Sequence, residues 1–151
     1  MYFFGHIGIV LFLGFILFLP LSFVLIGSML PDVIDKPLFL LGIIPSGRYI
    51  SHTLFFVAAS GIATYIITRK KLAALSLSFG VLLHLFLDSM HFVPWFYPFI
   101  DYQFVPYKME FVLDPILISA EVIGLALLII LVKYRTRLDN MRNKLRTKFR
   151  K

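Results

Sequence analysis

Two side chains that can bind a metal ion, His84 and Asp88, lie one helical turn apart within an otherwise apolar stretch of the chain. Residues four positions apart project from the same face of a helix, so the imidazole and the carboxylate would stand one above the other. A carboxylate placed within a membrane costs about 2.5–3.5 kcal/mol on insertion scales, so it needs a partner or a function. A metal ion would satisfy both groups, although a structural hydrogen-bonded pair would also explain them.

Further acids and imidazoles occur where they should reach the same level. Asp32 and Asp35 follow the first apolar stretch, His52 opens the second, and His91 continues the face of His84 seven residues later. Helical bundles build metal sites from histidine and carboxylate side chains on several helices. We therefore expect these groups to converge. Because the chain has no cysteine, the ligands would be His, Asp or Glu, which favours zinc, manganese or iron.

The composition is that of an integral membrane protein. Hydrophobic residues make up 60% of the 151 positions and the mean hydropathy is +0.90, whereas soluble domains are about 45–50% apolar. A helical span needs about 20 apolar residues. Apolar segments of roughly this length fall at 7–30, 52–68, 72–90 and 112–132. The predicted fold is an all-α membrane protein, a bundle of four to five transmembrane or re-entrant helices over residues 1–132.

Positive charge is concentrated in a tail at residues 133–151, which holds nine basic residues and one acid. Short basic segments stay on the cytoplasmic side, so this tail and the turn at residues 69–71 should both be cytoplasmic. The loops at about 31–51 and 91–111 would then face outward, with the metal site near the outer face of the inner membrane. The tail is predicted to be an amphipathic helix on the inner leaflet, although a disordered basic tail would fix the same topology.

The first apolar segment has two possible structures. It could be one span kinked near Leu19-Pro20, or a re-entrant hairpin that reverses there. Asp32 follows His6 by 26 residues, which a straight helix would separate by about 39 Å. His6 could therefore join the other candidate ligands only if the segment folds back.

An ordered set of motifs resembles the YdjM-like family. The motifs are Gly5-His6, residues 30–37, residues 48–54, His84-x-x-x-Asp88 and the aromatic loop at 94–98. Members are inner-membrane proteins of bacteria and archaea that are predicted to be metal-dependent hydrolases. The order His, Asp, His, His-x-x-x-Asp also resembles that of zinc-dependent phospholipase C. This likeness implies a set of metal ligands made of His6, Asp32, His52, His84 and Asp88.

The chain departs from the family pattern at three points. Gly47-Arg48-Tyr49 stands where many members have His-Arg-Gly, and Ser51-His52-Thr53 replaces Thr-His-Ser. The acidic motif is Asp-x-x-Asp rather than Asp-x-Asp-His. One candidate ligand is therefore missing, and we expect one metal ion, or two with sparse ligation.

The resemblance to zinc-dependent phospholipase C implies hydrolysis of a phosphoester of a lipid or lipid-linked amphiphile by metal-activated water. Asp35 is the expected general base and Arg48 the expected binding group for an anionic part of the substrate, although Arg48 could simply anchor the chain at the headgroups. The expected partners are the lipid bilayer and an amphiphilic substrate, with no nucleic acid. The aromatic residues 95–97 could line the access path or belong to an interfacial belt.

Two other function classes remain open. The cluster could be structural or partner-binding in a non-catalytic membrane protein, or it could relay ions in a small transporter, against which the weakly polar segment 54–68 argues. Glu121 is a further charge in an apolar stretch and should point into the bundle. It could be a neutral acid bonded to a backbone carbonyl, or it could orient a ligand histidine. Asp114 before Pro115 is the expected N-cap of the last helix.

Overall fold

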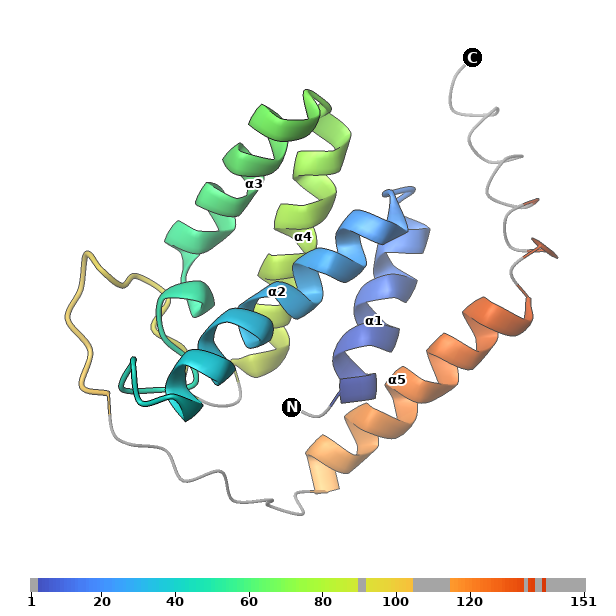
Figure 1. Ribbon diagram of the computed structural model, residues 1–151. Coiled ribbons are helices and arrows are strands. Elements are labelled where there is room, and N and C mark those ends of the chain that lie inside the picture. Colours follow the sequence, from blue (N-terminus) through green and yellow to red (C-terminus); the bar gives the residue numbers. More distant parts are fainter. Residues whose placement is uncertain (1–2, 90–91, 105–114, 135, 138–139, 141–151) are drawn as a thin grey trace.

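The computed structural model describes residues 3–89, 92–104, 115–134, 136–137 and 140, and this part of the chain is helical without strands. The predicted all-α fold is thereby confirmed. Candidate ligand His91, N-cap Asp114 and most of the basic tail lie outside the described residues. The elements, shown in Figure 1, are α1 (Phe3–Ile16), α2 (Leu21–Leu40), the short 3-10 helix η1 (Ile50–His52), α3 (Leu54–Thr68), α4 (Lys71–Asp88) and α5 (Pro115–Lys133).

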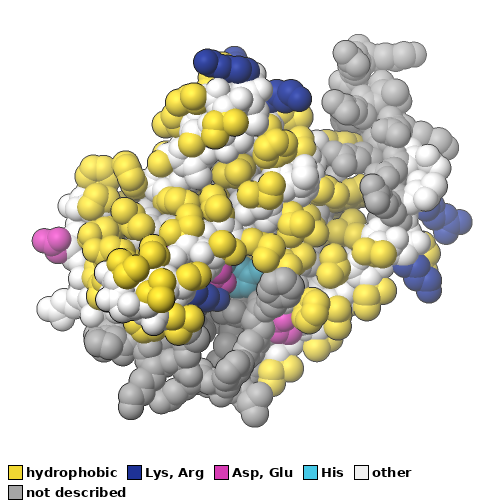
Figure 2. All heavy atoms as spheres, viewed as in Figure 1, with side chains coloured by type: hydrophobic (Ala, Val, Ile, Leu, Met, Phe, Trp, Pro, Cys, Tyr) yellow, Lys and Arg dark blue, Asp and Glu magenta, His cyan; other side chains and the backbone are white. Residues whose placement is uncertain are grey.

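Helix α4 meets the length and hydropathy that a membrane crossing requires, and within the described residues no other helix does. Two shorter apolar helices cover Phe4–Ile16 and Leu54–Thr68. The face of the molecule in Figure 2 is covered mainly by hydrophobic side chains, while basic side chains gather at the turn between α3 and α4. A mainly apolar exterior is what a lipid environment demands.

The first apolar segment folds back on itself. Helix α1 ends at Ile16, Phe18 adopts a left-handed conformation (φ 59°), and α2 begins after Pro20. The two helices then run in opposite directions (Figure 1). This hairpin returns the chain to the end of the molecule where His6 lies, so the separation required by a single straight helix does not arise.

Helix α2 is longer than the sequence suggested, because it continues through Pro31 and Pro37 to Leu40. The prediction of an outer loop at 31–51 was wrong for its first ten residues, which are helical. A proline removes one hydrogen bond of the helix but does not forbid it where neighbouring groups support the backbone. The chain at residues 49–51 packs along this part of α2: the Ser51 hydroxyl donates to the carbonyl oxygen of Pro31 at 2.9 Å, and the Asp35 side chain accepts from the Tyr49 N–H at 2.7 Å.

Helices α2 and α4 touch backbone to backbone at two glycines. A Cβ on Gly27 would lie 2.2 Å from the Leu77 carbonyl oxygen, and one on Gly80 would lie 2.3 Å from that of Val24. Small residues permit this close approach in membrane bundles. A core cluster beyond it joins α4 to the loop after it: Leu77, Val81, Leu85 and Val93, with Phe23, Leu30, Phe56, Val57 and Trp95 packed against it.

The direction of these two helices places the candidate ligands. Both run the same way from their contact point (Figure 1). Asp32 follows Gly27 by five residues and His84 follows Gly80 by four, so each lies about one turn beyond the contact. The glycine contact therefore brings the acids of α2 level with His84 and Asp88.

Helix α5 packs along α1 and holds its first turn. The Glu121 carboxylate accepts hydrogen bonds from the N–H groups of Phe4 (2.8 Å) and Gly5 (3.0 Å). The first amides of a helix have no partner within the helix and carry partial positive charge, so a carboxylate stabilises them. Neither partner expected for Glu121, a backbone carbonyl or a ligand histidine, is the one found. The residue fixes the chain directly before His6.

The glycine contact can be tested by adding one methyl group. Gly80→Ala should destabilise the fold by about 1–3 kcal/mol, because α2 and α4 must move apart to admit the new Cβ. Thermal unfolding of the purified protein in detergent measures the effect. Gly47→Ala is the matched control, since its nearest contact would be a Phe39 side-chain carbon at 3.6 Å. Equal melting temperatures for the two variants would contradict the packing argument.

Candidate metal centre

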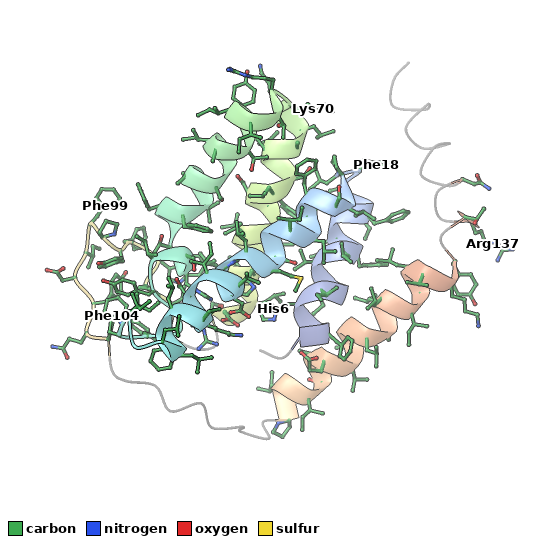
Figure 3. The ribbon with its side chains drawn as sticks, viewed as in Figure 1. His6, Phe18, Lys70, Phe99, Phe104 and Arg137 are labelled. Atoms are coloured by element: carbon green, nitrogen blue, oxygen red, sulfur yellow. The ribbon has the colours of Figure 1, made fainter. Side chains whose placement is uncertain are left out.

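Four side chains from α2, η1 and α4 converge at one end of the bundle. Asp32, His52, His84 and Asp88 each offer one ligand atom, and these four atoms all lie within 4.8 Å of one another. Figure 3 shows His6 toward this end, whereas Phe18 and Lys70 lie at the other. These four residues, distant in the sequence, form a group that could bind a metal ion.

The spacing of the four atoms suits a small cation. His52 Nε2 lies 3.3 Å from His84 Nε2, 3.5 Å from Asp32 Oδ1 and 3.9 Å from Asp88 Oδ2, and the distance from His84 Nε2 to Asp32 Oδ1 is 3.7 Å. Ligand bonds of about 2.0–2.1 Å in tetrahedral geometry place neighbouring ligand atoms about 3.3–3.4 Å apart. The group therefore needs only small movements to surround one ion.

The chemistry of these atoms also fits a cation. Asp32 Oδ1 is buried and has no hydrogen-bond partner in the described part of the chain. A buried acceptor without a donor is costly. Two imidazole nitrogens, those of His52 and His84, face each other beside it. An ion between these lone pairs would satisfy all three residues.

Asp35 lies behind His52 and is fully buried. Its Oδ2 is 2.8 Å from His52 Nδ1, and the carboxylate also accepts from the backbone N–H groups of Tyr49 and Ser51. Nδ1 is not the nitrogen that approaches Asp32 and His84. The sequence predicts Asp35 as the general base, but its hydrogen bonds are those of a carboxylate that orients a ligand histidine.

The surrounding carboxylates create a negative potential at His52. Burial disfavours the imidazolium form, but the nearby carboxylates of Asp32 and Asp35 outweigh it and raise the pKa of His52 above its usual value.

His6 reaches the cluster but is not one of the four converging groups. Its Nε2 lies 3.3 Å from Asp88 Oδ1, and its ring is centred 4.4 Å from that of His84. The folded-back first segment makes this contact possible. The predicted ligand His6 thus faces the oxygen of Asp88 that points away from His52.

Arg48 forms a contact that the sequence did not reveal. Its Nε donates to Asp88 Oδ2 at 2.6 Å, and the two side chains are 17% and 3% exposed. Forty residues separate them, so no local pattern indicates the pair. The ion pair between Lys36 and Asp32, by contrast, has the four-residue spacing that a helix predicts.

Tyr49, the residue after Arg48 in the chain, belongs to an aromatic wall. The hydroxyls of Tyr49 and Tyr97 are 2.7 Å apart, and the ring of Phe104 packs against both, at 4.8 and 5.6 Å between centroids. Trp95, one of the aromatics expected to line access to the site, instead packs against the core cluster and Phe86. Of the three aromatics at 95–97, Tyr97 therefore belongs to this wall, together with Tyr49 and Phe104.

The role of Asp35 can be measured through metal affinity. Asp35→Asn should weaken zinc binding about 10–100-fold, because the amide holds the His52 ring less well and removes a charge. Competition with a chelating indicator on the purified protein measures the dissociation constant. Asp101→Asn, the same change at an exposed loop position, should leave it unchanged. An unaltered affinity in a folded Asp35→Asn protein would contradict the assignment.

A family match covers almost the whole chain. A model of a family described as the YdjM inner membrane protein matches residues 1–147, which include every candidate ligand. No curated protein and no solved structure matches the chain. Because the family match covers 147 of the 151 residues, the chain belongs to the YdjM family of inner membrane proteins.

Proposed function

We propose that this protein is a membrane-embedded, metal-dependent hydrolase that acts on a phosphoester of a lipid or lipid-linked amphiphile. The observation that carries the proposal is the convergence of Asp32, His52, His84 and Asp88 at distances suited to one cation. Zinc fits imidazole and carboxylate ligands in tetrahedral geometry, and manganese or iron are the alternatives. When bound, such an ion lowers the pKa of a coordinated water toward 7 and polarises a phosphoryl oxygen.

The residues around the four candidate ligands have different roles. Asp35 orients His52, while His6 and Arg48 contact the two oxygens of Asp88. Asp32 is the most accessible of the converging groups, with a side chain 27% exposed. The substrate therefore approaches on the side of Asp32 and Arg48, where the guanidinium can bind an anionic oxygen.

The surroundings of the site support an amphiphilic substrate. The loop after α2 exposes Leu41 and Ile43, and Phe99 is 80% exposed at the same end of the molecule. In Figure 2, basic, acidic and histidine side chains reach the surface together amid hydrophobic ones. A polar site within an apolar surface matches a substrate with a phosphorylated headgroup and a lipid tail.

A closed structural site is the second candidate, and burial favours it. His52, His84 and Asp88 are at most 3% exposed. With a purely structural site, the protein would bind metal and would melt at a lower temperature after metal removal, but it would have no hydrolase activity. The hydrolase loses turnover of a fluorogenic lipid phosphoester on metal removal and regains it on addition.

We propose that the chain crosses the inner membrane several times, with the metal centre near the outer face and the C-terminus in the cytoplasm. In support, the turn after α3 carries Arg69, Lys70 and Lys71, while α5 ends at Lys133 before the basic tail. Reporter fusions after Lys71 and after Lys151 should both signal a cytoplasmic location. A fusion after Asp101 should signal the outer side. An outward signal from either of the first two would overturn this topology.

The metal centre is tested by elemental analysis. Purified wild-type protein should contain about one equivalent of zinc, manganese or iron. The His84→Ala and Asp88→Ala variants should retain less than roughly a tenth of this metal, because each substitution removes one of the four candidate ligands. Thr64→Ala removes a buried polar group on α3 outside the cluster and should keep the metal. Equal metal content in all four proteins would leave the hydrolase without support.

A further inference from the structure

The Arg48–Asp88 pair has a consequence for how many ions the site holds. The Asp88 oxygen that Arg48 contacts at 2.6 Å is the one nearer His52, at 3.9 Å from Nε2. We propose that the centre holds a single divalent cation and that the Arg48 guanidinium takes the place of a second one, binding an oxygen of the substrate's phosphoester. The inference rests on the proposed function and specifies its metal count and its anion-binding group.

Within the described residues, the ligands for a second ion are too few. Outside the four converging residues, the nearby imidazole and carboxylate groups of the described chain are those of His6 and Asp35. Asp35 is fully buried and engaged with His52 Nδ1 and with backbone amides. His6 faces Asp88 Oδ1 at 3.3 Å. A second ion there would have one histidine and one shared carboxylate, whereas zinc sites in proteins use three or four protein ligands.

The charge of the centre also favours one ion. Three carboxylates, those of Asp32, Asp35 and Asp88, stand against two cationic side chains, Arg48 and Lys36. With neutral imidazoles the centre carries one net negative charge, and a divalent ion changes this to one positive charge. That value suits an anionic phosphoester. A second divalent ion would leave three positive charges in a largely buried site, where burial penalises unbalanced charge.

The geometry leaves Arg48 able to bind an anion. Its bond to Asp88 uses the Nε–H group, and the two Nη groups carry the other four N–H donors in a planar fork. Such a fork matches two oxygens of a phosphate. Asp88 belongs to the four converging ligands and also binds the Arg48 guanidinium. It therefore keeps the metal ion and the guanidinium next to each other. One carboxylate thereby couples the metal position to the anion position.

Zinc content and phosphate binding of the full chain in detergent test the proposal. Wild-type protein loaded with zinc should hold about one equivalent and should bind inorganic phosphate, measured by calorimetry. Arg48→Gln should keep its zinc but bind phosphate about tenfold or more weakly, since it loses charge-assisted hydrogen bonds. Arg48→Lys should fall between the two, because it keeps the charge and loses the fork. Lys70→Gln, a charge loss at the opposite end of the molecule, should match wild type.

Each contrary result has a distinct meaning. Two equivalents of zinc in the wild type, or unchanged phosphate affinity in Arg48→Gln and Arg48→Lys, would overturn the inference and leave the hydrolase standing. Loss of zinc from folded Arg48 variants would also overturn it, because Arg48 would then serve the ligand Asp88 and not an anion. If Arg48→Gln does not fold, Arg48→Lys decides alone. A wild-type protein that binds no metal would instead refute the proposed function itself.

Discussion

The backbone contact between α2 and α4 is the constraint on which the site depends. Gly27 and Gly80 let the two helices approach until a side-chain carbon would collide with a carbonyl oxygen. About one turn beyond that contact, the helices present carboxylates and an imidazole at the same level. In a bilayer, packing and not water exclusion holds helices together. A few small residues therefore determine whether the candidate ligands meet.

A second constraint is the excess of negative charge that this convergence produces. Asp32, Asp35 and Asp88 gather around His52 and His84 in an apolar bundle, where unpaired charge is costly. Hydrogen bonds from backbone amides and the side chains of Arg48 and Lys36 offset part of this negative charge. The spacing of the four ligand atoms also suits a cation. Membership of the YdjM family fixes the kind of membrane protein, and the surplus of acid gives the physical reason to expect a metal ion.

The fold lies largely within reach of sequence reasoning. The lengths of the apolar segments and the basic residues between them predicted α3, the turn at residues 69–71, α4 and α5 to within a few residues. Local hydrophobicity largely determines these elements. The proximity of His84 and Asp88 likewise follows from their i,i+4 spacing on a helix. The ordered motifs identified the family before any distance was known. Proline misled the expectation for α2, since the helix continues through Pro31 and Pro37 beside a segment whose contacts no local rule indicates.

Long-range partners could not be predicted in this way. From residue types alone, Asp35 could serve as a base or as a positioning group, and only its bond to His52 distinguishes the two. The pairing of Arg48 with Asp88, and of Glu121 with the first turn of α1, joins residues 40 or more positions apart. The sequence by itself determined which groups are available and on which helices they stand. The tertiary structure decided which of them meet, because a buried polar group takes whichever partner the packing of helices brings within hydrogen-bond distance.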